Sequence, residues 1–293
     1  MFAKYSTALA GGALLAVVSV PAFAADIFEP QVIEAAPPPP VVYEQPVAES
    51  GGWYIRGDLG YSRSDFRGGD WVTPGTPAGS NSFTSGKLKG AWTGGVGVGY
   101  QITSHLRTDL TLDYLGKSNF RGSSRGACTV AADCISTDTS SFSAWGLLAN
   151  AYVDIGTWHG ITPYVGAGIG GAHIKWDTLA NTACDATDPT SCDPTEYHGG
   201  KKSWRFSYAL MAGASYCLTD KLKLDAGYRF RRIEGGGMFG LAAAPGVTGP
   251  GYDKGFNVHE GRAGLRYQFG GRTGCEKEQI AYIPEPVDPP IYK

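Results

Sequence analysis

The sequence predicts an all-β fold, an eight-stranded antiparallel transmembrane up-and-down barrel with long extracellular loops and short periplasmic turns. Two observations carry this prediction. From Leu222 to Arg231, apolar residues alternate without a break with charged or small ones, which is typical of a strand whose two faces meet different media. The 293 residues also include 43 Gly, 16 Tyr, 12 Phe and 7 Trp, a composition that favours tightly packed strands, tight turns and interfacial aromatic side chains.

The beginning of the chain indicates export. Lys4 precedes an uncharged run from Ala8 to Val20, and Ala22-Phe23-Ala24 has the small residues of a cleavage site. Residues 1–24 are therefore predicted to be a secretory signal peptide. The apolar run is too short for an ordinary membrane-spanning helix, so any insertion into a membrane must use strands.

Three further regions follow the signal peptide. Residues 25–50 contain six prolines, five acidic residues and no basic residue, which predicts a stiff, acidic periplasmic linker without a core. Residues 51–270 form the predicted barrel, and residues 271–293 a periplasmic C-terminal extension. A net charge of −2 without a basic cluster gives no indication of nucleic-acid binding.

The first four predicted strands place large apolar side chains on one face, assigned to lipid, and charged or small side chains on the other. These strands are Trp53 to Ser62, Leu88 to Gln101, a third that includes Leu106 to Tyr114, and Ser141 to Asp154. Their lipid-facing residues are Trp53, Ile55, Leu59 and Tyr61; Trp92, Val96, Val98 and Tyr100; Leu106, Leu110, Leu112 and Tyr114; and Trp145, Leu147 and Val153.

The last four predicted strands continue this alternation. They begin near Ile161 and span Trp204 to Cys217, Leu222 to Arg231, and Phe256 to Phe269. In the strand after Ile161, glycines alternate with apolar residues and match a dinucleotide-binding glycine pattern. That pattern requires a following helix, and here a strand continues. We therefore interpret these glycines as space in the lumen for large side chains such as Tyr152 or Arg205.

The connections alternate between short and long. The short ones are Ile102 to His105, Ile155 to Gly160 and Leu218 to Lys221, and the long ones start at Arg63, Gly116, Thr178 and Glu234. Short periplasmic turns and long surface loops are typical of bacterial outer-membrane barrels, and this topology places both barrel ends in the periplasm. A soluble eight-stranded lipocalin is disfavoured, because the outward residues would expose a large apolar patch to water.

Three segments resemble a known family. They are Gly52-Trp53-Tyr54-Ile55-Arg56-Gly57-Asp58-Leu59-Gly60-Tyr61, Trp145 to Asp154, and Thr162-Pro163-Tyr164-Val165-Gly166-Ala167-Gly168-Ile169-Gly170. The chain from Gly52 to Phe269 is similar to the small surface-antigen barrels of Gram-negative outer membranes, the opacity-type, porin-like family. The resemblance implies an outer-membrane location, contact with outer-membrane lipid and lipopolysaccharide, and an insertion machinery that recognises a terminal aromatic residue. That residue is Phe269 here, although 24 residues follow it.

The six cysteines suit an exported, oxidised protein. Cys128 and Cys134 share the second predicted surface loop, and Cys184 and Cys192 share the third, so each pair is expected to close its own loop. Cys217 and Cys275 lie on the periplasmic side and are expected to pair with each other. A metal site is disfavoured, because the chain contains no C-x-x-C pattern and its five histidines are scattered.

The inward faces carry many charges, which could indicate catalysis or an ion path. We interpret them instead as a mutually neutralising network in the lumen, because buried charges must be paired. Its predicted members are Arg56, Asp58, Arg107, Asp109, Asp113, Asp225, Arg229, Arg262 and Arg266. The acidic residues of the third surface loop, namely Asp185, Asp188, Asp193 and Glu196, lack the EF-hand spacing of a calcium site and are interpreted as a solvated surface.

These observations predict a non-enzymatic envelope protein for structure and surface recognition, like an adhesin or antigen, with a host or envelope ligand at its extracellular loops. No catalytic, cofactor or metal site is predicted. One alternative is a narrow porin for small solutes, which the inward charges oppose because eight strands leave room only for side chains. Another is an outer-membrane lipid-modifying enzyme. The candidate histidines His173 and His259 oppose that class, because their neighbours Ile174 and Glu260 point to the other face.

Overall fold

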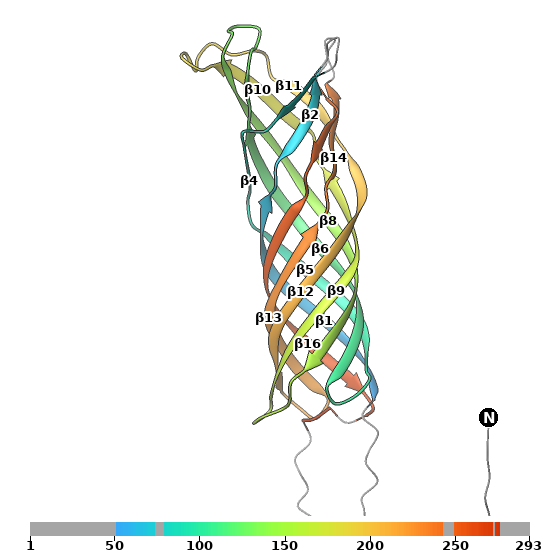
Figure 1. The fold of residues 1–293 in the computed structure, drawn as a ribbon. Coiled ribbons are helices and arrows are strands. Elements are labelled where there is room, and N and C mark those ends of the chain that lie inside the picture. Colours follow the sequence, from blue (N-terminus) through green and yellow to red (C-terminus); the bar gives the residue numbers. More distant parts are fainter. Residues whose placement is uncertain (1–50, 74–78, 243–248, 272, 276–293) are drawn as a thin grey trace, which may run out of the picture. The chain divides into compact units, whose positions relative to one another are not determined.

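The computed structural model describes residues 51–73, 79–242, 249–271 and 273–275. Over these residues, sixteen strands form a single antiparallel sheet (Figure 1), which confirms the predicted all-β, antiparallel fold. The expected signal peptide, the linker and most of the C-terminal extension lie outside the described residues. The strands are β1 (Gly52–Phe66), β2 (Gly69–Thr73), β3 (Gly79–Ser82), β4 (Ser85–Leu88), β5 (Ala91–Gln101), β6 (Leu106–Ser123), β7 (Arg125–Gly126), β8 (Cys134–Asp154), β9 (Ile161–Trp176), β10 (Leu179–Asp185), β11 (Glu196–Gly200), β12 (Lys202–Cys217), β13 (Leu222–Ile233), β14 (Gly236–Ala242), β15 (Gly251–Asp253) and β16 (Phe256–Phe269).

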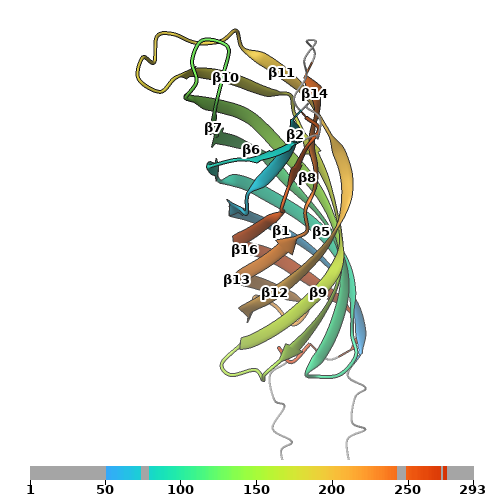
Figure 2. The same cartoon turned by 45° about the horizontal axis from the view of Figure 1, so that its top comes forward.

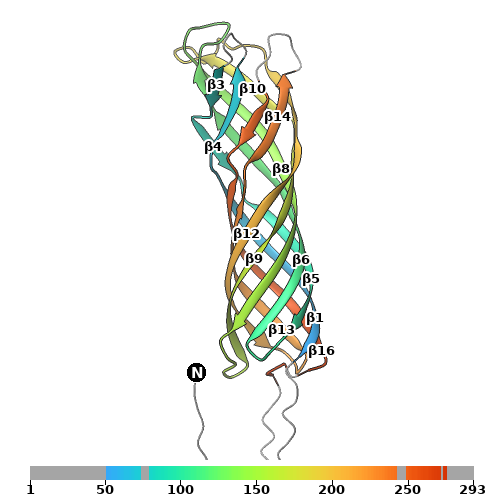
Figure 3. The same cartoon turned by 45° about the vertical axis from the view of Figure 1, so that its right-hand side comes forward.

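Eight of these strands pair in a closed circuit. β1 pairs with β16 on one side and with β5 on the other, and the pairing continues through β6, β8, β9, β12 and β13 back to β16. All of these pairs are antiparallel, and the strands run obliquely around the barrel wall (Figures 1 and 3). Because the circuit closes, none of its strands leaves an unpaired edge.

The sheet has eight strands besides those of the closed circuit, because the long connections form strands of their own. β2, β3, β4, β7, β10, β11, β14 and β15 belong to these connections and extend the sheet at one end (Figure 2). The circuit strands also run further than predicted, with β8 beginning at Cys134, whereas Leu88 to Gln101 is divided between β4 and β5. Pairing continues along the connections because backbone N–H and C=O groups gain partners in a ladder.

The opposite end of the barrel has short turns that threonine side chains stabilise. In the turn after β5, the hydroxyl of Thr103 accepts hydrogen bonds from the amides of the second and third following residues at 3.2 and 3.0 Å. Thr219 accepts the equivalent pair in the turn after β12 at 3.3 and 3.1 Å. Side-chain bonds of this kind hold the backbone in a turn rather than in a ladder. In both hairpins, the turn is therefore formed where a threonine is followed three residues later by an apolar residue.

Near these turns, each circuit strand shows the predicted alternation of faces. In β1, Trp53 and Leu59 are 61% and 72% exposed on the outer surface, whereas Arg56 and Asp58 are buried inside. The small inward residues give space to large ones, because a side chain at Gly166 of β9 would collide with the ring of Tyr152. The sidedness predicted from the sequence is correct for this part of the barrel.

Further from the turns, the polarity of the two faces reverses. In β6, the outward residues change from Leu112 and Tyr114 to Lys117 and Arg121, which are exposed. Over the same stretch, the inward residues change from charged Asp113 to apolar side chains, which are buried. A face that meets water becomes polar and the enclosed face becomes apolar. The reversal therefore marks the level at which the wall passes from an apolar medium to water.

The interior is arranged in three layers, all of which β8 crosses. Counting from the turns, its inward residues are first Asp154 and Tyr152, then Ala144 and Phe142 in an apolar layer, and finally Asp138 in a polar region near the long connections. The apolar layer was not expected from the sequence. It consists of Ala91, Leu115, Phe120, Phe142, Ala144, Ala172, Ile174, Trp176, Leu179, Ile233, Met238, Phe239, Phe256 and Val258.

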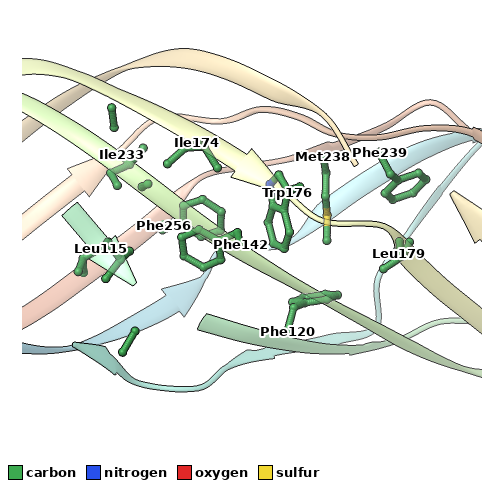
Figure 4. Packing of buried hydrophobic residues seen from close by; sticks show 14 residues of the cluster. Leu115, Phe120, Phe142, Ile174, Trp176, Leu179, Ile233, Met238, Phe239 and Phe256 are labelled. Atoms are coloured by element: carbon green, nitrogen blue, oxygen red, sulfur yellow. The ribbon is translucent and has the colours of Figure 1, made fainter. Parts of the chain in front are cut away.

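Aromatic side chains from several strands fill the apolar layer (Figure 4). Phe142 of β8 stacks on Phe256 of β16 with a centroid distance of 4.8 Å and an interplanar angle of 4°. Trp176 contacts both rings and donates its indole N–H to Asp253 at 3.1 Å. Each of these rings is at most 2% exposed, so the layer closes the interior between the charged lumen and the polar region.

Candidate functional site: a cup at the end of the barrel

A cavity of about 490 Å³ lies beyond the apolar layer, and we refer to it as the cup. Strands of the long connections supply most of its wall, namely β2, β3, β7, β10, β11 and β14, together with the beginning of β8. Its volume is within the range of small-molecule and side-chain binding sites. No sequence pattern indicates this cavity, because the segments that surround it are distant in the chain and lack regular alternation.

Three aromatic residues line one part of the cup. Trp71 of β2 and Phe83 have ring centroids 4.9 Å apart, and Phe83 lies 6.5 Å from Phe239 of β14. Phe239 also meets the ring of His198 edge to face at 5.0 Å. Trp71 and Phe83 pack against the apolar layer, so the cup shares a boundary with it.

Asp138 is a buried carboxylate in the wall of the cup. It accepts a hydrogen bond from the hydroxyl of Ser136 at 2.7 Å and another from the amide of Asn181 at 2.5 Å. Asp138 lies on β8 seven residues before the outward Trp145, and therefore beyond the apolar outer surface. Burial raises the pKa of Asp138, although these hydrogen bonds and nearby His198 lower it in part.

Two further acidic residues line the cup. Asp193 accepts hydrogen bonds from the amide and hydroxyl of Thr129 through Oδ2, at 3.0 and 3.2 Å, but its buried Oδ1 has no partner among the described residues. Glu196 of β11 is half-exposed, and its Oε2 lies 3.9 Å from Nε2 of His198. The Nδ1 atom of His198, a residue 3% exposed, also lacks a hydrogen-bond partner within the described part of the chain.

Arg125 of β7 is the one arginine in the described lining of the cup. Its guanidinium makes two hydrogen bonds to Asp133, at 2.8 and 2.6 Å. This bidentate pair directs the guanidinium to Asp133. No ion pair joins Asp138, Asp193 or Glu196 to an arginine or lysine of the described cup wall.

The other two acidic residues of this connection lie outside the cup. Asp185 accepts hydrogen bonds from Thr187, and Asp188 accepts them from Thr190, in each case from both the amide and the hydroxyl. These bonds hold the pKa values of both carboxylates below their ordinary range. Among the described residues, no group of three or more histidine, cysteine or acidic side chains is placed to hold a metal ion.

Disulfides fix the connections around the cup and the end of the chain. The expected presence of disulfides is confirmed, and the pairs are Cys128–Cys134, Cys184–Cys192 and Cys217–Cys275. Cys128 and Cys134 both line the cup, and Cys184 lies in the neighbouring strand β10. The third bond joins the end of β12 to the segment after β16. The pairs are those expected from the sequence.

The predicted lumen charges all lie inside the barrel, each in an ion pair, and their direct contacts fall into several groups. In the first group, Arg56 contacts Asp58 at 2.8 Å and Asp109 at 3.1 Å. Arg262 reaches the same Asp58 at 2.6 Å. In the second group, Arg229 contacts Asp113 and Glu260, each at 2.8 Å, and the remaining groups are Arg107–Asp154 at 3.0 Å and Arg266–Asp225 at 3.1 Å.

Several lumen charges were missing from the predicted set. Asp154 and Glu260 are partners of predicted arginines, and the alternation of their strands already placed them inward. Arg231 and Lys223 are also buried on the inner face of β13. The pair of Arg205 with Asp253 at 2.6 Å has no sequence signal, because Asp253 belongs to a long connection.

Neither candidate histidine lies in the cup. Ile174 and Glu260 are buried inside, as expected. However, His259 has partners from neighbouring strands on both sides of its ring, on the outer surface of the barrel. Its Nδ1 lies 2.6 Å from the hydroxyl of Tyr228, and its Nε2 lies 3.3 Å from Asp65. Sequence reasoning missed this arrangement because it considered only adjacent residues. His173 instead packs against Trp204 at a centroid distance of 5.2 Å.

Phe269 is the last residue of β16 and pairs with Trp53 of β1. Its side chain is half-exposed on the outer surface and meets Tyr267 edge to face at 5.0 Å. Its recognition by an insertion machinery stays a prediction.

Residues 10–269 match the family described as outer membrane protein beta-barrel domain. An uncharacterized protein of Brucella abortus is 40% identical over 270 residues, which cover 81% of this chain and 94% of that protein. A Rickettsia bellii protein, provisionally named an adhesin, is 30% identical over 227 residues, or 73% of this chain and 87% of that protein. The crystal structure of Neisserial surface protein A covers 75% of this chain and 100% of that one, with 20% identity and a TM-score of 0.40. Within the described residues, no helix has the length and apolar character needed to cross a membrane.

Proposed function

Because the chain belongs to the outer membrane protein beta-barrel domain family, we propose that it is a non-enzymatic surface-recognition barrel whose cup receives a ligand outside the cell. The protein is located in the outer membrane of a Gram-negative bacterium, as its family and relatives show. The single observation that carries the proposal is the cup itself. It is walled by the long connections and separated from the lumen by the apolar layer.

The reversal of polarity supports the proposed placement in the membrane. The eight circuit strands would span the membrane where their outward faces are apolar, and the reversal in β6 between Tyr114 and Lys117 would lie at the outer boundary. Short turns at one end and long connections at the other match periplasmic turns and extracellular loops. In this orientation, the cup opens on the cell surface, where a recognition protein meets its ligand.

The layered interior supports recognition over passage of solutes. A solute entering through the cup would meet the aromatic rings of the apolar layer and then the paired charges of the lumen. Moving through either layer would separate packed rings or expose ion pairs that lack other partners. The narrow porin therefore remains an alternative without a supporting observation in the described residues.

The experiment compares two tryptophan substitutions in the same connection. Ala183 lines the cup, and Ala186, which is partly exposed, lies outside its lining. Cells that display Ala183→Trp should lose adherence to host cells or envelope components, because the indole fills the cup, whereas Ala186→Trp should adhere as the parent does. Surface amounts are matched by antibody labelling, and barrel formation is checked by the shift in gel migration on heating. Equal adherence of Ala183→Trp and the parent would contradict the proposal.

A further inference from the structure

We propose that the ligand of the cup is a basic peptide segment of a partner protein, which inserts a lysine or arginine side chain. This inference rests on the proposed function, because it assigns a ligand class to the same cup. Three independent features of the wall support it. They are its uncompensated charge, the chemical character of its unpaired atoms, and its aromatic surface.

The charge of the wall is negative. Asp138, Asp193 and Glu196 line the cup, and the arginine beside them is engaged by an aspartate outside the lining. Carboxylates enclosed in a cavity attract a cation more strongly than carboxylates on an open surface, because water screens them less. A cationic ligand would therefore be stabilised on entering the cup, and an anionic ligand would be repelled.

The two buried atoms of the wall that lack a partner among the described residues can accept hydrogen bonds. Oδ1 of Asp193 can only accept, and Nδ1 of His198 accepts when the ring proton is on Nε2, which faces Glu196. A buried acceptor without a partner is costly, so a ligand that brings N–H donors would satisfy both atoms. The lumen shows the opposite case, because Nη1 and Nη2 of Arg107 are unpaired donors.

The donors beside Asp138 and Asp193 are already engaged, which disfavours a glycan in this part of the wall. Ser136 and Asn181 donate to Asp138, and Thr129 donates to Asp193. A sugar presents hydroxyl groups that need acceptors and donors in similar numbers. This part of the wall offers mainly acceptors, as an ammonium or guanidinium group requires. A metal ion is also disfavoured, since no group of metal-ligating side chains is present in the described ranges.

The aromatic surface suits the rest of a basic side chain. Trp71, Phe83 and Phe239 present rings to the cup. A cation held over an aromatic face gains electrostatic attraction, and the methylene groups of lysine or arginine gain apolar contact. A volume of about 490 Å³ is large enough for a side chain with part of its backbone, which favours a peptide over a free amine.

The experiment uses the purified full chain in uncharged lipid nanodiscs and a fluorescent tetralysine peptide. We expect saturable binding that Glu196→Gln and Asp193→Asn each weaken about tenfold or more, because each change removes a charged acceptor. Asp188→Asn is the matched control, since this acidic residue lies in the same connection but outside the cup, and it should bind as the parent does. The same peptide with acetylated lysines should not bind.

Several outcomes would overturn the inference. Equal binding of the acetylated peptide would show that the positive charge is not recognised, and an equal loss in Asp188→Asn would show attraction to surface charge alone. Binding of spermidine as tightly as the peptide would indicate a free amine as ligand, and binding of a neutral oligosaccharide instead would indicate a glycan. Loss of adherence in Ala183→Trp without any binding of the peptide would leave the proposed function intact and reject only the ligand class.

Discussion

The lumen and the cup are both enclosed polar regions of one barrel, but they differ in whether their charged groups have partners of opposite charge. In the lumen, each predicted charge has an opposite charge within 3.1 Å, as with Arg56 and Asp109. In the cup, three carboxylates share a wall without a free cation, and two buried acceptors are unpaired among the described residues. Pairing, rather than the type of residue, therefore distinguishes a structural charge from one available to a ligand.

The difference follows from how each region is built. The lumen is formed by neighbouring circuit strands, whose strict alternation brings opposite charges to fixed positions on one face. The cup is formed by separate connections that disulfides such as Cys128–Cys134 hold in place. Substitutions in the lumen should therefore change stability, and substitutions in the cup should change binding.

The largest expected effect is in the lumen. Arg229→Ala should lower the free energy of unfolding by roughly 3–5 kcal/mol, because Asp113 and Glu260 would remain buried without their shared partner. Urea titration of the protein in lipid vesicles, followed by tryptophan fluorescence, measures this change. Peptide binding by the folded fraction should not change.

The matched control for this substitution is an exposed ion pair. Lys117 and Asp177 lie 3.0 Å apart outside the lumen, with Lys117 71% exposed, so Lys117→Ala should have little effect on stability. If both substitutions changed the free energy of unfolding equally little, the lumen pairs would not be structural. The contrast between the lumen and the cup would then fail.

The second expected effect concerns conduction. The intact protein should show no steady single-channel openings in a planar bilayer, because the apolar layer and the lumen ion pairs both interrupt a continuous water path. Blocking the cup with Ala183→Trp should make no difference to this baseline. Reproducible openings that disappear on denaturation would show that the lumen conducts ions, and would favour the narrow porin over the surface-recognition barrel.

The smallest expected effect is the response of the cup to pH. Because burial raises the pKa of Asp138, its carboxylate takes up a proton at a higher pH than an ordinary aspartate. Peptide affinity should fall several-fold as the pH is lowered through the range in which Asp138 takes up its proton, and recover on return, since one negative charge of the cup is lost. The contribution of Asp138 to stability has the opposite sign, because a raised pKa favours the folded state at low pH and loses this effect as the pH rises.

The control for the pH response is Asp138→Asn, which should bind more weakly at pH 7 and show a flatter dependence on pH. The titratable group that acts on Asp138 from a neighbouring strand is His198 of β11, and Ser136 and Asn181 are its uncharged partners. An unchanged pH profile in this variant would assign the response to another group of the cup.

Much of the barrel could be predicted from the sequence. The bounds of β16 match the prediction of Phe256 to Phe269, and the outward and inward residues of β1 are correct. Both successes come from one physical cause, namely that a strand between lipid and a polar interior must alternate with a period of two. The same alternation identified the arginines and aspartates of the lumen.

The cup and the apolar layer could not be predicted in the same way. The layer reverses the polarity of the faces, with Phe142 and Phe256 pointing inward, and the alternation predicted from the sequence did not include such a reversal. The cup depends on contacts between distant segments, such as Asn181 with Asp138, which no local pattern records. Asp193 and Glu196 were interpreted as a solvated surface, whereas the structure places both in the wall of the cup.

The length of β8 beyond the reversal determines how far the cup stands from the lipid boundary. Eleven residues separate the outward Trp145 from Cys134 at the start of the strand. At about 3.3 Å per residue and a tilt of about 45°, this segment would raise its tip about 25 Å above the lipid boundary. In the proposed orientation, this part of the sheet would be extracellular, and the aromatic side chains that it encloses would stiffen it. It would hold the opening of the cup above the lipid headgroups, within reach of a neighbouring cell's proteins.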